Sequence, residues 1–238
     1  KKQSSIEVIL DFKNLAKKQT LLTYFYGTGL AAILQMQGKF AIHAYGVVTE
    51  DGLYLFCGPS GVGKSTLSAA LKSRGYPFFT DDKCVLFQDS NYKGWMAYPS
   101  LQIMRLWEDT TAVIATNSFL SDPIRVVADV AKYQYQISPN EQVSDCVPLK
   151  TIFILSESQE VTTPTLQLLQ GVEKMNYLQT QIFRRFMVQG FQQDIALWNF
   201  TSRLAVDIPV YLLRRPATGT VVETVDFVET IISSPTKN

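Results

Sequence analysis

One stretch in the first third of the chain constrains the fold more than any other. The mostly apolar segment Leu53 to Cys57 precedes a glycine-rich loop, and a helix-forming sequence begins at Lys64. An apolar run of this length, bounded by glycine, favours a buried strand. Glycines at both ends of the loop allow the backbone to curl until its N–H groups converge. The order of strand, glycine loop and helix predicts an α/β fold with the loop at one edge of the sheet.

The loop fits the phosphate-binding pattern G-x-x-x-x-G-K-[ST]. Converging N–H groups and the positive end of the following helix form a site for an anion. We expect Lys64 to reach the β- and γ-phosphates of a nucleotide and the Ser65 hydroxyl to bind Mg²⁺. A nucleotide with Mg²⁺ is therefore the predicted ligand of the loop. The predicted nucleotide-binding residues are Gly58, Pro59, Ser60, Gly61, Val62, Gly63, Lys64, Ser65 and Thr66.

An acidic pair, Asp81-Asp82, follows the next predicted strand, 17 residues after Lys64. That distance suffices for one helix and one returning strand, so both carboxylates are expected at the phosphate edge of the sheet. Neighbouring strand residues point to opposite faces. We therefore expect the two carboxylates to have different roles, one accepting a proton from an attacking hydroxyl and the other helping to hold Mg²⁺. The alternative without chemistry is that the pair only turns the chain after the strand.

The single histidine of the chain, His43, lies in a predicted strand over Phe40–Thr49. The turn Glu50-Asp51-Gly52 has a hairpin signature and joins this strand to the one that precedes the loop. His43 is therefore expected one strand away from the loop. One histidine excludes a multi-histidine metal site, and by spacing alone a histidine in such an apolar segment is more often a core residue.

The rest of the chain predicts a mixed sheet flanked by helices, of the P-loop kinase-like class. Residues 1–38 are expected to form a partial N-terminal appendage with a packing helix over Thr20–Gln37, and residues 39–238 the catalytic domain. Met96–Met104 contains Pro99 and is therefore expected to be an edge or broken strand. Further expected elements are a helix over Arg105–Thr116, two helices in Gly171–Leu204 separated near Gly190, and a final helix over Val221–Ile232.

Bulk properties exclude several classes of partner. The net charge of +1 gives no support for nucleic acid or membrane as a partner. No apolar run approaches the roughly 20 residues of a membrane span. The three cysteines are sparse and lack metal-binding spacing, which predicts reduced thiols and a cytoplasmic setting. The segment Ile152–Leu155 is followed by Glu157, which we interpret as a surface residue.

Taken together, His43, the glycine loop and Asp81-Asp82 resemble the catalytic domain of the HPr kinase/phosphorylase family. The segment Gly75–Asp82 is similar to the family's Gly-His-x-x-x-Ala-Asp-Asp, and the resemblance covers about residues 40–90. It implies an ATP- and Mg²⁺-dependent kinase that phosphorylates a serine of a protein or peptide. It further implies that Asp81 is the base, with Asp82 supporting it or the metal, and that His43 lies near the transferred phosphate. A homo-oligomer is one assembly that the resemblance suggests.

The segment Tyr98–Trp107 stands where the family has Leu-Glu-Ile-Arg-Gly-Leu-Gly. Together with Pro148–Leu155 it looks more like the divergent lasso-peptide precursor kinases, which implies the C-terminal serine of a precursor peptide as acceptor. Arg105, Arg125 and Lys132 are then candidate cations for the peptide carboxylate.

Two alternatives stay open at the level of the residues. One is a nucleotide-dependent binding or regulatory module that transfers nothing, and the other is a P-loop kinase of a small-molecule hydroxyl. The chain lacks the Asn-Lys-x-Asp segment of Ras-like GTPases and the Leu-Ser-Gly-Gly-Gln segment of transporter ATPases.

Overall fold

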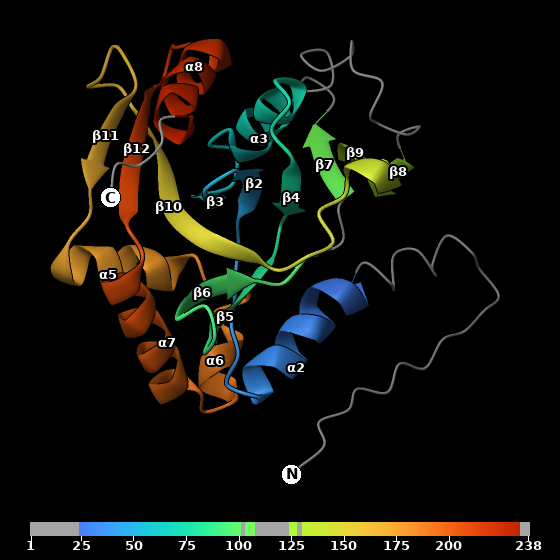
Figure 1. Ribbon diagram of the computed structural model, residues 1–238, viewed down its shortest axis with the longest axis vertical. Coiled ribbons are helices and arrows are strands. Elements are labelled where there is room, and N and C mark those ends of the chain that lie inside the picture. The colour runs from blue at the N-terminus through green and yellow to red at the C-terminus, as the bar shows by residue number, and fades with distance from the viewer. Residues whose placement is uncertain (1–23, 101–102, 108–123, 128–129, 234–238) are drawn as a thin grey trace.

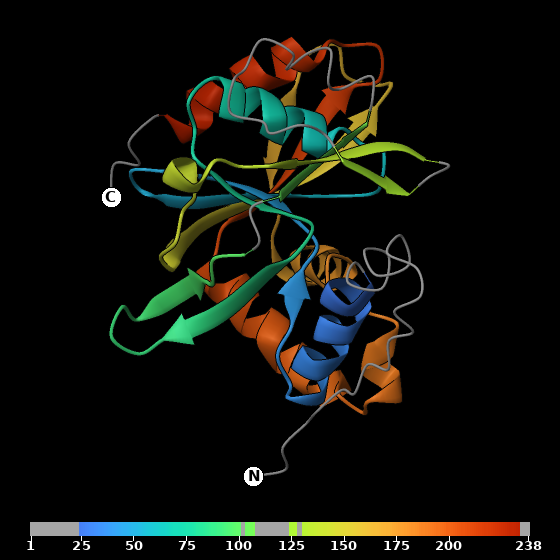
Figure 2. The ribbon, with the colours of Figure 1, turned by 90° about the vertical axis from the view of Figure 1, so that its right-hand side faces the viewer.

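The computed structural model describes residues 24–100, 103–107, 124–127 and 130–233. A mixed sheet lies at the centre with helices on both of its faces (Figures 1 and 2), which confirms the predicted α/β class. Among these residues no helix is both long and apolar enough to cross a membrane. The predicted appendage falls largely outside the described residues, so the domain boundary at residue 38 stays a prediction.

Two sheets are present in the described part of the chain. The larger has nine strands in the order β1-β5-β6-β10-β3-β2-β4, with β12 beside β10 and β11 beside β12. Its strands are β1 (Ala41–Ile42), β2 (Tyr45–Thr49), β3 (Gly52–Cys57), β4 (Phe78–Asp81), β5 (Cys84–Asp89), β6 (Gly94–Ala97), β10 (Val147–Ser158), β11 (Thr165–Leu168) and β12 (Val210–Pro216). The smaller sheet has the order β7-β9-β8. Its strands are β7 (Ile103–Trp107), β8 (Ile124–Val127) and β9 (Val130–Gln136).

The helices divide between the two faces of the larger sheet. α3 and α8 cover one face, and α2, α5, α6 and α7 lie on the other side (Figure 2). The helical elements are η1 (Phe25–Gly29, a π-helix), α2 (Leu30–Met36), α3 (Lys64–Ser73), η2 (Pro139–Glu141, a 3₁₀-helix), α5 (Gly171–Thr180), α6 (Met187–Gly190), α7 (Asp194–Asp207) and α8 (Val221–Ile232).

Strand β3 is buried throughout because its alternating side chains serve two cores. Leu53 and Leu55 pack with residues of α5 and α7 on one face. Tyr54 and Phe56 pack with residues of α3 and α8 on the other. Fully burying one such side chain contributes about 1.5–3 kcal/mol, so the strand that precedes the glycine loop is held from both sides.

Strand order decides which residues meet at the phosphate edge. β3 is parallel to β10 and antiparallel to β2, and β2 is antiparallel to β4. β3 and β4 therefore run in the same direction, with the start of β2 between their carboxyl ends. In the ladder Tyr45 pairs with Phe56 on one side and with Asp81 on the other. The predicted placement of the acidic pair at the edge of the loop is confirmed.

The structure corrects three of the predicted elements. The strand expected over Phe40–Thr49 is two strands, because β1 pairs with β5 whereas β2 pairs with β3 and β4. Arg105 to Trp107 are part of strand β7 rather than a helix. The rest of that predicted helix lies outside the described residues. The expected break at Pro99 is present, since Met96 belongs to β6 and Met104 to β7. The region Gly171–Leu204 holds three helices instead of two.

Candidate active site

The glycine loop leaves β3 at Cys57 and enters α3 at Lys64. Gly58, Gly61 and Gly63 have φ of 136°, 85° and 96°, a region that residues with a side chain rarely adopt. At Gly58 an added Cβ would lie 2.6 Å from the carbonyl oxygen of Leu155. The loop therefore needs glycine there both for its backbone conformation and for its contact with β10.

Lys64 is buried and holds the loop in its curled form. Its Nζ donates hydrogen bonds to the carbonyl oxygens of Gly58, at 2.8 Å, and Pro59, at 2.7 Å. The first turn of α3 adds the positive end of a ten-residue helix next to it. Backbone N–H groups, a helix N-terminus and a cation thus converge, which is the chemistry that binds phosphate.

A small cavity of about 150 Å³ lies between the loop and the acidic pair. The loop forms one wall, and the other comes from the ends of β2 and β4 with His43. The lining residues are His43, Tyr45, Ser60, Gly61, Gly63, Lys64, Ser65, Thr66, Asp81 and Asp82. The structure thus brings His43 and the acidic pair together with the loop, as the sequence predicts.

Tyr45 connects the loop with the first carboxylate. Its hydroxyl is hydrogen-bonded to the carboxylate of Asp81 and to the hydroxyl of Ser65. Burial, and then the neighbouring charge of Asp81, raises the pKa of the Tyr45 hydroxyl. The phenol therefore keeps its proton at physiological pH and donates it to the buried Asp81 carboxylate.

The two carboxylates have different surroundings. Asp81 is buried, whereas the side chain of Asp82 is 23% exposed. Asp82 Oδ1 lies 3.3 Å from Nδ1 of His43, and its Oδ2 lies 3.1 Å from Nζ of Lys83. Its φ of 115° is unusual for a residue with a side chain, and its N–H donates to the carbonyl oxygen of Ala44. Asp82 is therefore held beside His43 and Lys83, whereas Asp81 is buried beside Tyr45.

His43 lies between two openings of the molecule. A second pocket of about 510 Å³ shares His43 and Asp82 with the phosphate cavity. Its other wall is the segment from Thr180 to Phe186, which follows α5. The His43 ring is stacked on Phe183 at 5.9 Å, and the His43 N–H donates to the carbonyl oxygen of Gln181 at 2.7 Å. A partly exposed side chain at this junction differs from the core histidine that spacing alone favours.

Sequence reasoning missed several residues that hold the site. The side chain of Gln181 accepts a hydrogen bond from the Gly58 N–H at 2.9 Å. Arg215, at the end of β12, donates to the carbonyl oxygen of Val62 at 2.9 Å and pairs with Glu157 at 2.5 Å. Glu157 is exposed, as predicted, yet it lies beside the loop through this pair. Strand direction is the one signal that could have pointed to Arg215 and Glu157, because β12 and β10 run parallel to β3 and end at the same edge.

The donor set at the cavity fits a nucleotide-bound Mg²⁺. Magnesium usually takes one or two protein oxygens and completes its shell with phosphates and water. Ser65 and the acidic pair supply oxygens of this kind. In the described part of the chain no group of three or more His, Cys, Asp or Glu side chains is arranged around a metal site. The residues present therefore suit a metal that arrives with phosphate groups.

The predicted cations of the acceptor site stay a prediction. Arg105, Arg125 and Lys132 belong to strands of the smaller sheet, and their side chains lie outside the described residues. The described wall next to His43 carries Arg184 and Arg185.

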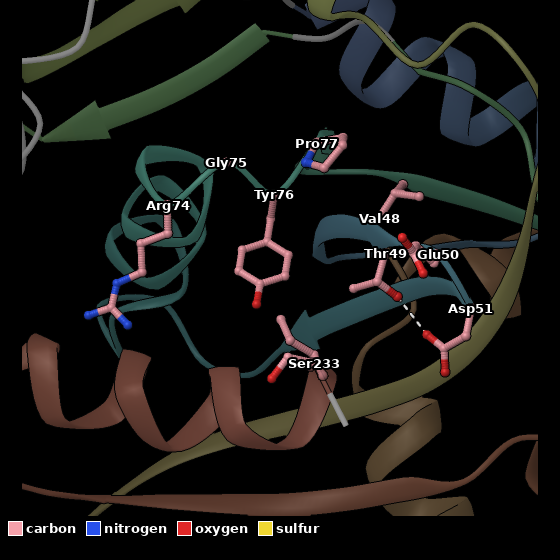
Figure 3. Close-up of a pocket in the computed structure, with 10 residues that line it drawn as sticks. Val48, Thr49, Glu50, Asp51, Arg74, Gly75, Tyr76, Pro77 and Ser233 are labelled. Atoms are coloured by element: carbon pink, nitrogen blue, oxygen red, sulfur yellow. Dashed lines mark hydrogen bonds between the residues drawn. The ribbon is translucent and has the colours of Figure 1, made fainter. Parts of the chain in front are cut away.

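A larger cavity, of about 790 Å³, lies at the opposite end of β3 (Figure 3). The turn between β2 and β3, the ends of α3 and α8, and Tyr76 form its walls. Thr49 donates a hydrogen bond to Asp51 there at 2.6 Å, which stabilises the turn. None of the predicted site residues lines this cavity.

Comparison with solved structures shows a distant resemblance. The structure of the Hpr(Ser) kinase/phosphatase from Coxiella burnetii is similar to this chain with a TM-score of 0.40 and 14% sequence identity, over 80% of this chain and 95% of that chain. No protein-family model matches the sequence, and no curated protein matches it. At this level of similarity the geometry of the site decides what the chain can do.

Proposed function

We propose that the protein is an ATP- and Mg²⁺-dependent kinase that transfers the γ-phosphate to a serine hydroxyl of a protein or peptide. One observation carries the proposal. The phosphate cavity and a second, open pocket meet at His43 and Asp82, with the buried Asp81 carboxylate on the phosphate side. Two adjacent cavities that share wall residues, one for the donor and one for the acceptor, suit group transfer better than nucleotide binding alone.

The loop residues would hold the nucleotide. Lys64 and the N–H groups of the loop would contact the phosphates, and Ser65 with Asp82 would hold Mg²⁺. When bound, Mg²⁺ neutralises charge on the phosphates. Arg215 supports the same loop through its bond to Val62. In this proposal the γ-phosphate end of the nucleotide would face the acidic pair.

Asp81 is the better proton acceptor of the two carboxylates. Both oxygens of Asp82 already face a cationic or imidazole nitrogen, from His43 and Lys83, which stabilises its ionised form. Asp81 receives a hydrogen bond from the neutral Tyr45 hydroxyl instead. In the proposed step the acceptor oxygen forms a bond to the γ-phosphorus, the bond from that phosphorus to the bridging oxygen breaks, and the hydroxyl proton passes to Asp81. ADP is the leaving group.

His43 and Lys83 lie beside Asp82, where the phosphate cavity and the second pocket share wall residues. Both side chains contact the Asp82 carboxylate, which lines the proposed transfer site. We propose that His43 contacts the phosphate or the acceptor there, since it lines both pockets. For the acceptor itself, the sequence resemblance supports two candidates: the serine of an HPr-type protein and the C-terminal serine of a lasso-peptide precursor.

Phosphate transfer measured by mass spectrometry tests the proposal. The full chain is incubated with Mg-ATP and each candidate acceptor, and one added phosphate on serine is expected. Asp81→Asn should lower the rate about 10²–10⁴-fold, since it removes the base, while a fluorescent ADP analogue still binds. Asp145→Asn is the matched control, because Asp145 is exposed ahead of the start of β10.

Other outcomes would contradict this function. Binding of ATP with no transfer to any protein, peptide or small hydroxyl compound would favour a nucleotide-dependent binding module. Transfer to a small alcohol alone would favour a small-molecule kinase. Transfer to serine that Asp81→Asn leaves unchanged would contradict the role of Asp81.

A further inference from the structure

We infer that the second pocket receives an acidic peptide segment, whose carboxylates flank the acceptor hydroxyl and bind Arg184 and Arg185. The inference rests on the proposed function and names the class of acceptor for the same site. The pocket of about 510 Å³ is large enough for a few side chains of an extended peptide.

Uncompensated positive charge marks this pocket. Arg184 and Arg185 are both exposed, and among the residues that the structure describes no carboxylate pairs with either guanidinium. The Arg184 guanidinium lies 5.4 Å over the ring of Phe183, an aromatic contact that leaves its charge available to a ligand. Each guanidinium group presents donor pairs that match a carboxylate.

The wall that carries these arginines is rigid before any ligand binds. The buried side chain of Gln35, from α2, donates to the carbonyl oxygens of Phe183, at 3.0 Å, and Arg184, at 3.2 Å. The N–H of Phe183 donates to the carbonyl oxygen of Ala41 at 2.8 Å. Arg184 has a φ of 56°, a left-handed conformation that these bonds sustain. A binding wall fixed in this way requires little ordering when a peptide arrives.

The wall is also fixed relative to the phosphate loop. Gln181 bonds to the N–H of Gly58, and of the residues from Gly58 to Thr66 only Gly58 lines this pocket. A nucleotide held by Lys64 and Ser65 would therefore bind on the other side of His43. The positive charge of Arg184 and Arg185 is left for the acceptor.

An apolar surface beside the arginines favours a peptide over a free small anion. Phe186 is 72% exposed and lines the same pocket. A peptide can place a carboxylate on a guanidinium and an apolar side chain on the phenyl ring at the same time, which a small anion cannot. We therefore expect a serine with aspartate or glutamate within a few residues, and an apolar residue nearby.

Peptide binding without nucleotide tests the inference independently of catalysis. Three labelled peptides share one serine and one apolar residue, and carry flanking Asp and Glu, Asn and Gln, or Lys. Fluorescence anisotropy should show about tenfold or tighter binding of the acidic peptide than of the neutral one. Arg184→Glu with Arg185→Glu should abolish that preference and favour the Lys peptide, while the affinity for a fluorescent ADP analogue is unchanged.

Two further variants keep the test decisive. Lys39→Glu with Arg203→Glu makes the same change in charge at a different pocket, beside β5, and should leave the preference intact. Arg185→Glu alone avoids the left-handed position and should weaken binding of the acidic peptide about threefold to tenfold. Equal binding of the three peptides, or equal losses in the Lys39/Arg203 control, would overturn the inference.

The outcomes separate the two proposals. Serine transfer that ignores flanking charge overturns the acidic acceptor and leaves the kinase intact. Arginine-dependent binding of the acidic peptide, with no transfer to any serine in the presence of Mg-ATP, overturns the kinase and retains the binding site.

Discussion

The two ends of strand β3 open into very different cavities. At the amino end the cavity is the larger, about 790 Å³ against about 150 Å³ at the glycine loop. Both cations near the larger cavity are paired with carboxylates: Arg74 with Asp226 and Glu229 (Figure 3 shows the arginine), and Lys150 with Asp51. At the loop end a lysine, a helix N-terminus and two carboxylates face one small space. Convergence of groups, rather than volume, marks the end that can do chemistry.

The sharpest way to break this comparison is to remove one cation from each end. Lys64→Ala should lower phosphate transfer at least about 10²–10³-fold, as expected when a preorganised donor to the phosphates is lost. Arg74→Ala should leave the rate within about twofold and reduce the free energy of unfolding by about 0.5–1 kcal/mol, because its ion pairs are at the surface. Transfer assays and urea titrations measure both. Comparable losses of activity would refute the contrast.

Two glycines provide a matched pair of backbone changes. Gly58 and Gly52 have φ of 136° and 135°, and an added Cβ would lie 2.6 Å and 2.7 Å from a carbonyl oxygen. Replacement of either by alanine should cost about 1–3 kcal/mol of stability. Only Gly58→Ala should also weaken binding of a fluorescent ADP analogue beyond the loss of folded protein. If Gly52→Ala weakens nucleotide binding as much, the two ends are not functionally distinct.

Two tyrosines provide the smallest contrast and a pH dependence. Burial and a neighbouring aspartate raise the pKa of Tyr45 and of Tyr54 above the ordinary value of 10.0. A pKa that is higher in the folded state stabilises the protein fully below pH 10, and this contribution declines as the pH rises above 10. The free energy of unfolding should therefore fall less steeply with pH in Tyr45→Phe and in Tyr54→Phe than in the unmodified chain. The difference is up to about 1.4 kcal/mol per pH unit for each variant, measured by urea unfolding between pH 9 and 11.

Activity at neutral pH distinguishes the same two variants. Tyr45→Phe should slow transfer about twofold to tenfold, since it removes the hydrogen bond that the Tyr45 hydroxyl donates to Asp81. Tyr54→Phe should leave the rate unchanged, because its hydroxyl bonds to Asp51 at the other end of the strand. A slower rate in Tyr54→Phe alone would reverse the assignment of the two ends.

Local sequence patterns predicted the parts of the site that depend on short segments. The strand before the loop, the helix after it and the last helix follow from apolar runs, glycine and helical spacing, and the structure has all three. The position of Asp81-Asp82 followed from chain length and strand direction. These features are encoded close to where they act, so one sequence suffices to find them.

The remaining contacts are not local and left no pattern in the sequence. Gln181 reaches Gly58 across 123 residues, and Arg215 reaches Val62 across 153. The break between β1 and β2 at His43 arises because the two strands have different partners, which no local propensity records. The same holds for Lys83 and for the arginines after α5, whose roles depend on which segments the fold brings beside the acidic pair.

The position of β10 in the chain has a consequence for biosynthesis. β10 is the twelve-residue strand that pairs with β3 on the side away from β2, and the carbonyl oxygen of its Leu155 lies against Gly58. During translation the hairpin of β2 and β3 emerges long before β10, which begins at Val147. One edge of the apolar strand β3 then keeps its backbone N–H and C=O groups unpaired on the ribosome. Such an edge is prone to aggregation, and chaperones can bind it. The phosphate loop is therefore completed late, when the centre of the sheet closes.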